Sequence, residues 1–363
     1  MDSQHKKIRD FFRFRRIIVP MLLGLGVATF LLVRNFDAEA FREVNWGPRT
    51  YFYIFMSLLL MVVRDAAYMY RLRVLTDGQL SWRRSFEVIM LWEFASAVTP
   101  SIIGGSAIAL FIIHREGVSM GRTTAIVLVT AFLDELFYIL MVPIIFMIVG
   151  TQDLFTSGGE YVLMDTRFGT QGIFALGYVF ILVLTTIIVY GVFVNPRGTK
   201  LVLLTIFRLP FLRRWRPKAA ETGNEIIITS REMKGKPFIF WIKAFAGTFA
   251  SWTARFWVVN MLIMAFVGSG DHLLIYGRQL IMWVILLISP TPGGSGVAEI
   301  VFSGFLGDFI PAGLTPAMGL MWRTISYYPY LFIGAIILPA WLKRVYTPKP
   351  KPETTIEPPL KSS

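Results

Sequence analysis

The chain has 363 residues, none of them cysteine and only three of them histidine, and 16% of them are charged. The lack of cysteine excludes disulfides, thiolate metal sites and cysteine nucleophiles. The histidines (His5, His114 and His272) lie outside the apolar runs, so no zinc site or histidine-based triad is evident within those runs, and there is no Walker loop for ATP. We therefore expect no cofactor and no enzymatic activity.

Apolar residues dominate the chain: 55% of the residues are hydrophobic and the mean hydropathy is +0.59. Soluble globular proteins are less apolar and more charged, so we predict an all-α polytopic membrane protein. Its 31 Phe, 13 Tyr and 10 Trp suit aromatic belts at both membrane interfaces.

A net charge of +13 is compatible with nucleic-acid binding. However, no basic stripe stands clear of the apolar runs, and membrane orientation explains the excess more simply. The apolar run 17–33 follows a basic N-terminus, as in a signal peptide, but no A-x-A cleavage site comes after it. We interpret this run as a retained first span and expect no nucleic-acid partner.

The charge of the connecting segments predicts the orientation, because cytoplasmic loops are rich in Lys and Arg. The basic N-terminus 1–16 and the basic segment 195–237 belong in the cytoplasm, as does the connection after the second span, which we expect to end at Arg64 and Asp65. The acidic loop 150–172 belongs outside. The six predicted spans are 17–33, 51–63, 123–149, 173–194, 238–267 and 317–341.

We predict that two other segments do not cross the membrane. The stretch LVLLTIF at 201–207 lies within the basic segment and suits a helix along the cytoplasmic interface. The tail 342–363 is rich in Pro, Lys and Glu and has nothing to bury, so we expect it to be disordered and cytoplasmic.

Two apolar runs are interrupted by helix-breaking residues. The run 86–113 contains Thr99-Pro100 and Gly104-Gly105-Ser106, and the run 272–306 contains SPTPGGSG at 289–296. The resulting pieces are shorter than the about 20 residues needed to cross a membrane. We predict two broken re-entrant hairpins, the first from the cytoplasmic face and the second from the outside. The alternatives are a single kinked span for the first run and a turn at the membrane surface for the second.

The two halves of the chain then repeat one order of elements. Residues 17–149 read as helix, helix, hairpin, helix, and residues 173–341 read the same way from the opposite face. Inverted repeats with paired broken helices are a transporter architecture, in which the substrate binds near the middle of the membrane.

Ionisable side chains at membrane depth cost about 2.5–3.5 kcal/mol each, so each requires a partner, a wet cavity or a function. One interpretation is that they form buried ion pairs that fix helix register. The other is that some of them line a hydrophilic cavity; Asp134 is the most deeply placed acid, and we expect Glu135, on another face, to meet a neighbour. The residues concerned are Glu93, Asp134, Glu135, Glu299, Lys243, Arg255, Arg278 and Arg323.

A phospholipid headgroup matches this set of side chains. Arginine binds phosphate through two donors, and a helix N-terminus at a glycine-rich break also favours anions. We predict Arg255, Arg278 and Arg323 as phosphate contacts, and Glu299, Asp134 and Glu93 as contacts to a cationic group or as proton-coupling groups. An aspartyl-protease pair of Asp134 and Glu299 has no further support. The breaks contribute substrate-binding backbone at Pro100, Gly104, Gly105, Pro292, Gly293, Gly294 and Gly296.

At these motifs the chain resembles the lysylphosphatidylglycerol synthase transmembrane-region family, also described as flippase-like inner-membrane proteins. The sequence SPTPGGSGVAE at 289–299 is similar to the family's proline-glycine-glycine stretch ending in a glutamate. TPSIIGGSAIALFIIHREGVSMGRTTAIVL at 99–128, followed by Asp134, is similar to a second family motif. The chain has Ala131 where the family pattern leads us to expect an arginine, so an Arg–Asp pair within that helix is not carried over.

The resemblance implies a multi-pass protein of the bacterial inner membrane with both termini in the cytoplasm. The family's bifunctional relatives move aminoacylated phosphatidylglycerol between leaflets and carry a soluble aminoacyl-transferase domain, for which we expect this chain to have no room. We therefore expect a translocator of a phospholipid or another polar lipid, with membrane lipids as its partners. A transporter of a small solute or ion and a non-transporting scaffold are the alternatives, and the oligomeric state stays open.

Overall fold

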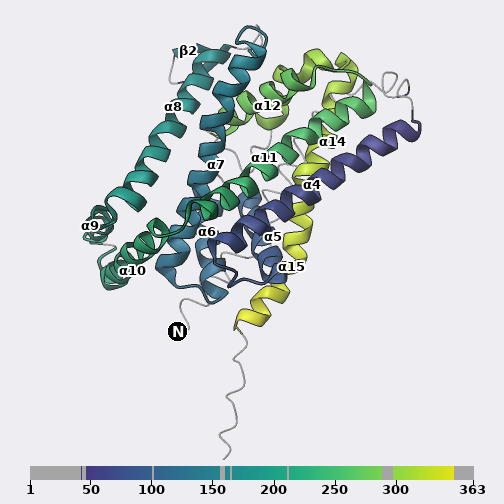
Figure 1. The fold of residues 1–363 in the computed structure, drawn as a ribbon. Helices are drawn as coiled ribbons and strands as arrows, with labels where there is room; N and C mark the ends of the chain where they lie inside the picture. Colours follow the sequence, from purple (N-terminus) through teal and green to yellow (C-terminus); the bar gives the residue numbers. More distant parts are fainter. Residues whose placement is uncertain are drawn as a thin grey trace, which may run out of the picture.

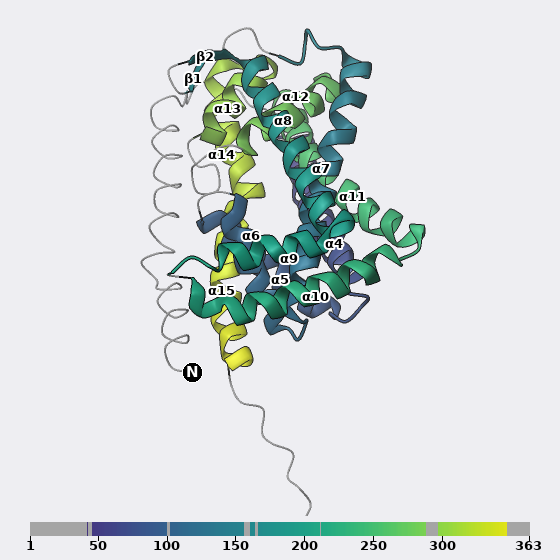
Figure 2. The ribbon, with the colours of Figure 1, turned by 90° about the vertical axis from the view of Figure 1, so that its left-hand side faces the viewer.

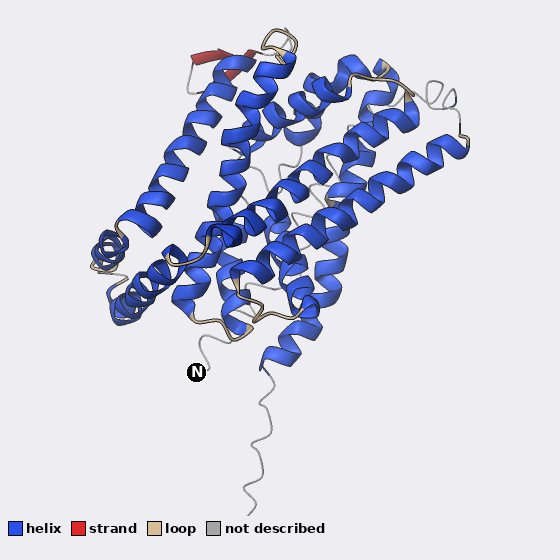
Figure 3. Cartoon of the chain, in the orientation of Figure 1, coloured by secondary structure: helices blue, strands red, loops and turns tan. Residues whose placement is uncertain are grey.

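The computed structural model describes residues 42, 46–99, 102–155, 160–163, 166–210, 212–287 and 297–346. This part of the chain is almost entirely helical, with one short strand hairpin (Figure 3). Five of its helical stretches are long and apolar enough to cross a membrane: Pro48–Leu75, Met120–Val149, Thr170–Val194, Phe238–Phe266 and Thr315–Tyr346. They coincide with five of the six predicted spans, and the sixth, 17–33, lies outside the described residues. The protein is a multi-pass helical membrane protein.

Helix α4 (Pro48–Leu75) is much longer than predicted. Its first turn carries Pro48, and no proline or glycine follows until Gly78, which has a positive φ of 74° next to Asp77 with φ 51°. The expectation that this span ends at Arg64 and Asp65 is wrong. These charged side chains stay within the helix because, as described below, they have partners inside the bundle.

Helices α5 (Trp82–Val98) and α6 (Ile102–Arg115) flank the first predicted break. We expected Gly104 and Gly105 to belong to the break, but both lie inside α6. The two helices pack closely: a Cβ atom on Gly105 would lie 2.0 Å from Oγ of Ser96 in α5. With 17 and 14 residues, each helix is shorter than a typical span.

Helix α7 (Met120–Val149) is capped by Ser119, whose hydroxyl accepts a hydrogen bond from the amide of Arg122. Helix α8 (Thr170–Val189) continues into a π-helical turn, Tyr190–Val194. Between α7 and α8, strands β1 (Glu160–Leu163) and β2 (Thr166–Gly169) form an antiparallel hairpin that the sequence analysis did not predict.

The basic segment folds into helix α9 (Pro196–Ile206), a 3-10 turn (Arg213–Trp215) and helix α10 (Arg216–Lys234). No residue of α9 is buried, and Leu201, Val202 and Ile206 are among its exposed side chains. An exposed apolar row is compatible with the predicted position along the membrane interface.

Helix α11 (Phe238–Phe266) runs alongside α4 (Figure 1), where Gly247 allows contact with the backbone of Ala67. Helices α12 (His272–Leu287) and α13 (Val297–Leu306) flank the second predicted break, which lies outside the described residues. Two 3-10 turns follow, Gly307–Phe309 and Ala312–Leu314. The predicted last span consists of two helices, α14 (Thr315–Ser326) and α15 (Tyr328–Tyr346), separated at Tyr327.

The two pairs of short helices lie in opposite halves of the bundle (Figure 2). Helices α5 and α6 lie in the half that also contains α9 and α10, whereas α12 and α13 lie in the half with the strand hairpin. The long helices α4, α7 and α11 connect the two halves (Figure 1).

Candidate functional site

A cavity of about 320 Å³ lies inside the helical bundle. It is lined by residues of α4, α5, α6, α7, α11 and α12 and of the segment 298–330, so both pairs of short helices contribute to its wall. Seven arginine, aspartate and glutamate side chains line it: Arg64, Arg71, Glu93, Asp134, Glu135, Arg255 and Arg323. Charged groups are rare at membrane depth and are typical of substrate or ion pathways.

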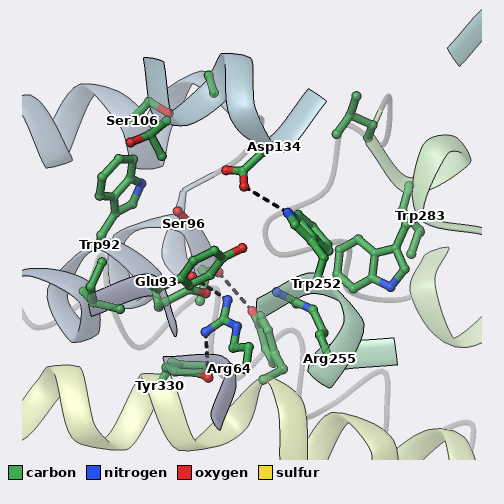
Figure 4. A pocket seen from close by; sticks show the side chains of 18 of the residues that line it. Arg64, Trp92, Glu93, Ser96, Ser106, Asp134, Trp252, Arg255, Trp283 and Tyr330 are labelled. Carbon is green, nitrogen blue, oxygen red and sulfur yellow. Dashed lines mark hydrogen bonds and ion pairs between the residues drawn. The ribbon is translucent and has the colours of Figure 1, made fainter. Parts of the chain in front are cut away.

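Arg64 holds the first of three arginine-carboxylate pairs. Its side chain is 1% exposed, and its Nη2 donates to Oε1 of Glu93 at 2.6 Å. Its Nη1 lies 2.7 Å from both Oδ1 of Asp65 and the hydroxyl of Tyr330 (Figure 4). These bonds connect α4, α5 and α15 at the wall of the cavity.

Arg71 holds the second pair. Its Nη1 donates to Oδ1 of Asp134 at 2.5 Å and to Oγ1 of Thr248 at 3.0 Å. Asp134 also accepts from Nε1 of Trp252 at 2.9 Å (Figure 4). The carboxylate of Asp134 is thus bound by one charged and one neutral donor from two other helices, α4 and α11.

Arg323 and Glu299 form the third pair, between α14 and α13. The Nε atom of Arg323 lies 3.0 Å from Oε1 of Glu299, and their side chains are 4% and 9% exposed. The guanidinium also lies over the ring of Tyr327, with 4.0 Å from Cζ to the ring centroid. Charges this deeply buried require a close partner, which each provides for the other.

Arg255 and Glu135 differ from these three pairs. Arg255 stacks on Trp283, with its Cζ 4.2 Å from the ring centroid, but its buried Nε has no hydrogen-bond partner. Glu135 is 5% exposed, and its buried Oε2 has no partner either. Within the described part of the chain, no ion pair involves either residue. They are therefore the two charged residues of the cavity wall that have no ion pair among the described residues.

Aromatic side chains separate these two charges. Tyr138 lies one turn after Glu135 in α7, and Trp252 lies one turn before Arg255 in α11. Their rings meet edge to face with centroids 5.1 Å apart. The neighbours of the two charges thus form one pair of aromatic rings, whose faces and edges suit apolar and cationic groups.

The structure places the predicted site residues in three groups. Glu93, Asp134, Arg255 and Arg323 line the cavity, and Glu299 adjoins it through its bond to Arg323. Arg278 is not among the lining residues; it donates to Asp308, to the carbonyl of Phe305 and to that of Asp153. The residues Pro100, Pro292, Gly293, Gly294 and Gly296 lie outside the described residues.

Two other residues of the ionisable set have different surroundings. Lys243 is exposed on the surface of α11. Glu135, which we expected to meet a neighbour, has no hydrogen-bond partner among the described residues for its buried oxygen.

The sequence analysis missed three cavity residues of α4. Arg64, Tyr68 and Arg71 follow one another at helical spacing on a single face, and both arginines lie over the Tyr68 ring with Cζ 4.5 Å from its centroid. The signal was present in the sequence, since no helix breaker occurs before Gly78. The prediction that the span ends at Arg64 excluded these residues from the membrane region.

No group of three or more His, Asp or Glu residues that could hold a metal ion occurs in the described ranges. The cavity wall combines charged side chains, hydroxyls and aromatic rings with aliphatic side chains such as Leu72 and Val127.

Comparison with known proteins indicates the family of this chain and a relative. The sequence profile of the family described as lysylphosphatidylglycerol synthase TM region matches residues 17–334. A UPF0104 membrane protein of Archaeoglobus fulgidus is 23% identical over 330 residues, which cover 88% of this chain and 95% of that relative.

Proposed function

This chain belongs to the lysylphosphatidylglycerol synthase TM region family, as its motifs predicted, and on that premise we propose that it moves a polar lipid between the leaflets of the membrane. The single observation that carries the proposal is the charged cavity of about 320 Å³, which is lined both by candidate membrane-spanning helices and by the short helices. A polar headgroup enters this cavity while its acyl chains remain in the bilayer.

The arrangement of the short helices supports this mechanism. We propose that α5–α6 and α12–α13 are re-entrant pairs from opposite faces, related as an inverted repeat. Residues of α5, α6 and α12 line the cavity, and Ala298 of α13 does as well. Movements of the two pairs would then open the cavity to one face at a time, as in transporters built from inverted repeats.

The charges of the wall suit a headgroup that leaves water. Three arginine-carboxylate pairs line or adjoin the cavity, so that much of its charge is already compensated before a ligand arrives. A headgroup therefore exchanges water for fixed charges and hydroxyls without the cost of a fully apolar path. Because nothing in this mechanism requires bond cleavage, the proposal is a transporter and not an enzyme.

Orientation and location are part of the same proposal. The basic segment containing α9 and α10 would face the cytoplasm by the positive-inside rule, together with both termini. The protein would then reside in the cytoplasmic membrane, which in bacteria is the inner membrane.

The test is a leaflet-exchange assay in proteoliposomes. Lipids with a fluorescent acyl chain and different headgroups are followed by quenching of the outer leaflet with dithionite. We expect the protein to increase the quenched fraction beyond one leaflet for at least one headgroup. A folded, correctly inserted protein that moves no lipid faster than empty vesicles contradicts the proposal and favours a solute transporter or a scaffold.

Matched variants separate the cavity from unspecific leakage. Ala131 lines the cavity, whereas Met147 of the same helix is 78% exposed on its outside. Ala131→Trp fills the cavity and is expected to abolish lipid exchange. Met147→Trp is expected to retain it.

A further inference from the structure

Arg255 and Glu135 are charges of opposite sign in one cavity, and neither has a charged partner among the described residues. We propose that they are the two ligand-binding charges of the cavity and that its ligand is a zwitterion, with an anionic phosphate-type group at Arg255 and an amine at Glu135. The inference rests on the proposed function only in taking the zwitterion to be a lipid headgroup.

The first argument is the distribution of charge. Glu93, Asp134 and Glu299 each lie within 3.0 Å of an arginine other than Arg255. Among the described residues that line the cavity, Glu135 is then the one acid and Arg255 the one base without an ion pair, and the two do not pair with each other. An unpaired charge buried in the bundle is costly, and a ligand that carries the missing countercharge removes that cost.

The second argument is the geometry at Arg255. Its guanidinium lies over the Trp283 ring at 4.2 Å and near the Trp252 ring at 5.6 Å, so its plane is held by two indoles (Figure 4). Its buried Nε has no acceptor. A planar, fixed guanidinium with free donors matches the oxygen atoms of a phosphate group, which bind such a fork through two hydrogen bonds.

The third argument is the position of Glu135. Its carboxylate lies one helical turn from Tyr138, whose ring contacts Trp252, the neighbour of Arg255 on α11. The two charges thus flank one aromatic pair and form no ion pair with each other. A ligand that contacts both carries an amine and a phosphate group, and the aromatic faces beside them favour a cationic amine.

Ligands with one kind of charge fit less well. A purely anionic ligand leaves Glu135 buried without a partner, and a purely cationic ligand leaves Arg255 without one. Only a zwitterion compensates both charges at once.

Binding to the purified full-length protein tests the inference without transport. The soluble probes are glycerophosphoethanolamine, with phosphate and amine, glycerophosphoglycerol, with phosphate only, and ethanolamine, with amine only; their affinities are measured by calorimetry in detergent. The corresponding lipids, phosphatidylethanolamine and phosphatidylglycerol, are compared by native mass spectrometry, so that a free zwitterion and a lipid headgroup are distinguished. We expect the zwitterion to bind about tenfold more tightly than either singly charged probe.

Two variants assign the charges. In Arg255→Gln, the zwitterion is expected to bind no more tightly than ethanolamine. In Glu135→Gln, it is expected to bind no more tightly than glycerophosphoglycerol. The matched controls are Arg83→Gln and Glu221→Gln, which remove exposed surface charges of the same types. If Arg255→Gln does not fold, Arg255→Lys, which keeps the charge but loses the planar fork, is expected to weaken zwitterion binding.

The proposal is overturned if the wild-type protein shows no preference for the zwitterion, or if the preference survives in the folded Arg255 and Glu135 variants. An effect of Glu135→Gln on the pH dependence alone would assign a proton to Glu135 and would also overturn it. Zwitterion binding without lipid exchange leaves the inference standing and the proposed function refuted. If both variants still exchange lipid with unaltered selectivity, the proposed function stands and the inference is refuted.

Discussion

Glu299 of α13 and Arg323 of α14 form a buried ion pair in which Oε1 and Nε are 3.0 Å apart. Removing one member leaves the other charge buried without its counterion. We expect Glu299→Gln to lower the free energy of unfolding by about 3 kcal/mol, and the double variant Glu299→Gln, Arg323→Gln to lose less than the sum of the two single variants. Thermal unfolding of the detergent-solubilised protein measures the three changes.

The same variants test the sequence hypothesis that Glu299 contacts the substrate. That hypothesis requires Glu299→Gln to abolish lipid exchange in protein that is still folded. If the double variant recovers both stability and exchange, Glu299 supports the bundle and does not bind the substrate.

The second prediction concerns Arg64, which bonds to Asp65, Glu93 and Tyr330. Arg64→Met removes the cation that compensates both acids, so we expect it to lower the free energy of unfolding by about 3–5 kcal/mol. Tyr330→Phe removes one neutral donor and acceptor and is expected to cost about 1 kcal/mol. Equal unfolding temperatures for wild type and Arg64→Met would show that this cluster does not stabilise the bundle.

The third prediction concerns the close packing of α5 on α6. A methyl group on Gly105 would overlap Ser96, whereas one on Gly304 in α13 has nothing within 4 Å. We expect Gly105→Ala to lower the free energy of unfolding by about 1–3 kcal/mol, because the two helices must separate. Gly304→Ala, the matched control, is expected to be neutral or stabilising, because alanine has a higher helix propensity than glycine. Similar unfolding temperatures for the two variants would contradict the close approach.

The fourth prediction concerns the direction of the short helix pairs. The chain has no native cysteine, so single cysteines report accessibility without a background. We expect His114→Cys, at the end of α6, to react with a membrane-impermeant maleimide only from the cytoplasmic side. Ser269→Cys, just before α12, is expected to react only from outside; both positions are exposed. Labelling of both positions from the same side would refute the proposal that the two helix pairs enter from opposite faces.

Labelling at two further positions tests the same arrangement. Arg122→Cys is expected to label from the cytoplasm and Asp308→Cys from outside. Both substitutions remove an ion pair, to Asp77 and Arg278 respectively, so the pair at His114 and Ser269 is the cleaner comparison.

Local sequence determined the class of protein and most of its helices. Hydropathy and the lengths of apolar runs are properties of consecutive residues, so they predicted five spans that the structure contains. Proline and glycine act on their own backbone, so they marked the gap between α5 and α6 near Pro100. The position of Gly105 inside α6 shows the limit of that signal, because glycine is tolerated in a helix where a neighbour packs closely.

Only the tertiary structure decided which charges are compensated and which remain available. Arg71 and Asp134 are 63 residues apart and meet because α4 and α7 line the same cavity. The absence of a helix breaker before Gly78 allows the helix to continue through Arg64, but the partners that compensate the charge of Arg64 come from other helices, and no local pattern reveals them. Composition and spacing specify which residues are buried together only weakly, since the cost of a buried charge depends on partners brought by other helices. The sequence alone did not distinguish Arg255 and Glu135 from the other buried arginines and acids. They differ because the other helices provide no ion-pair partner for them among the described residues.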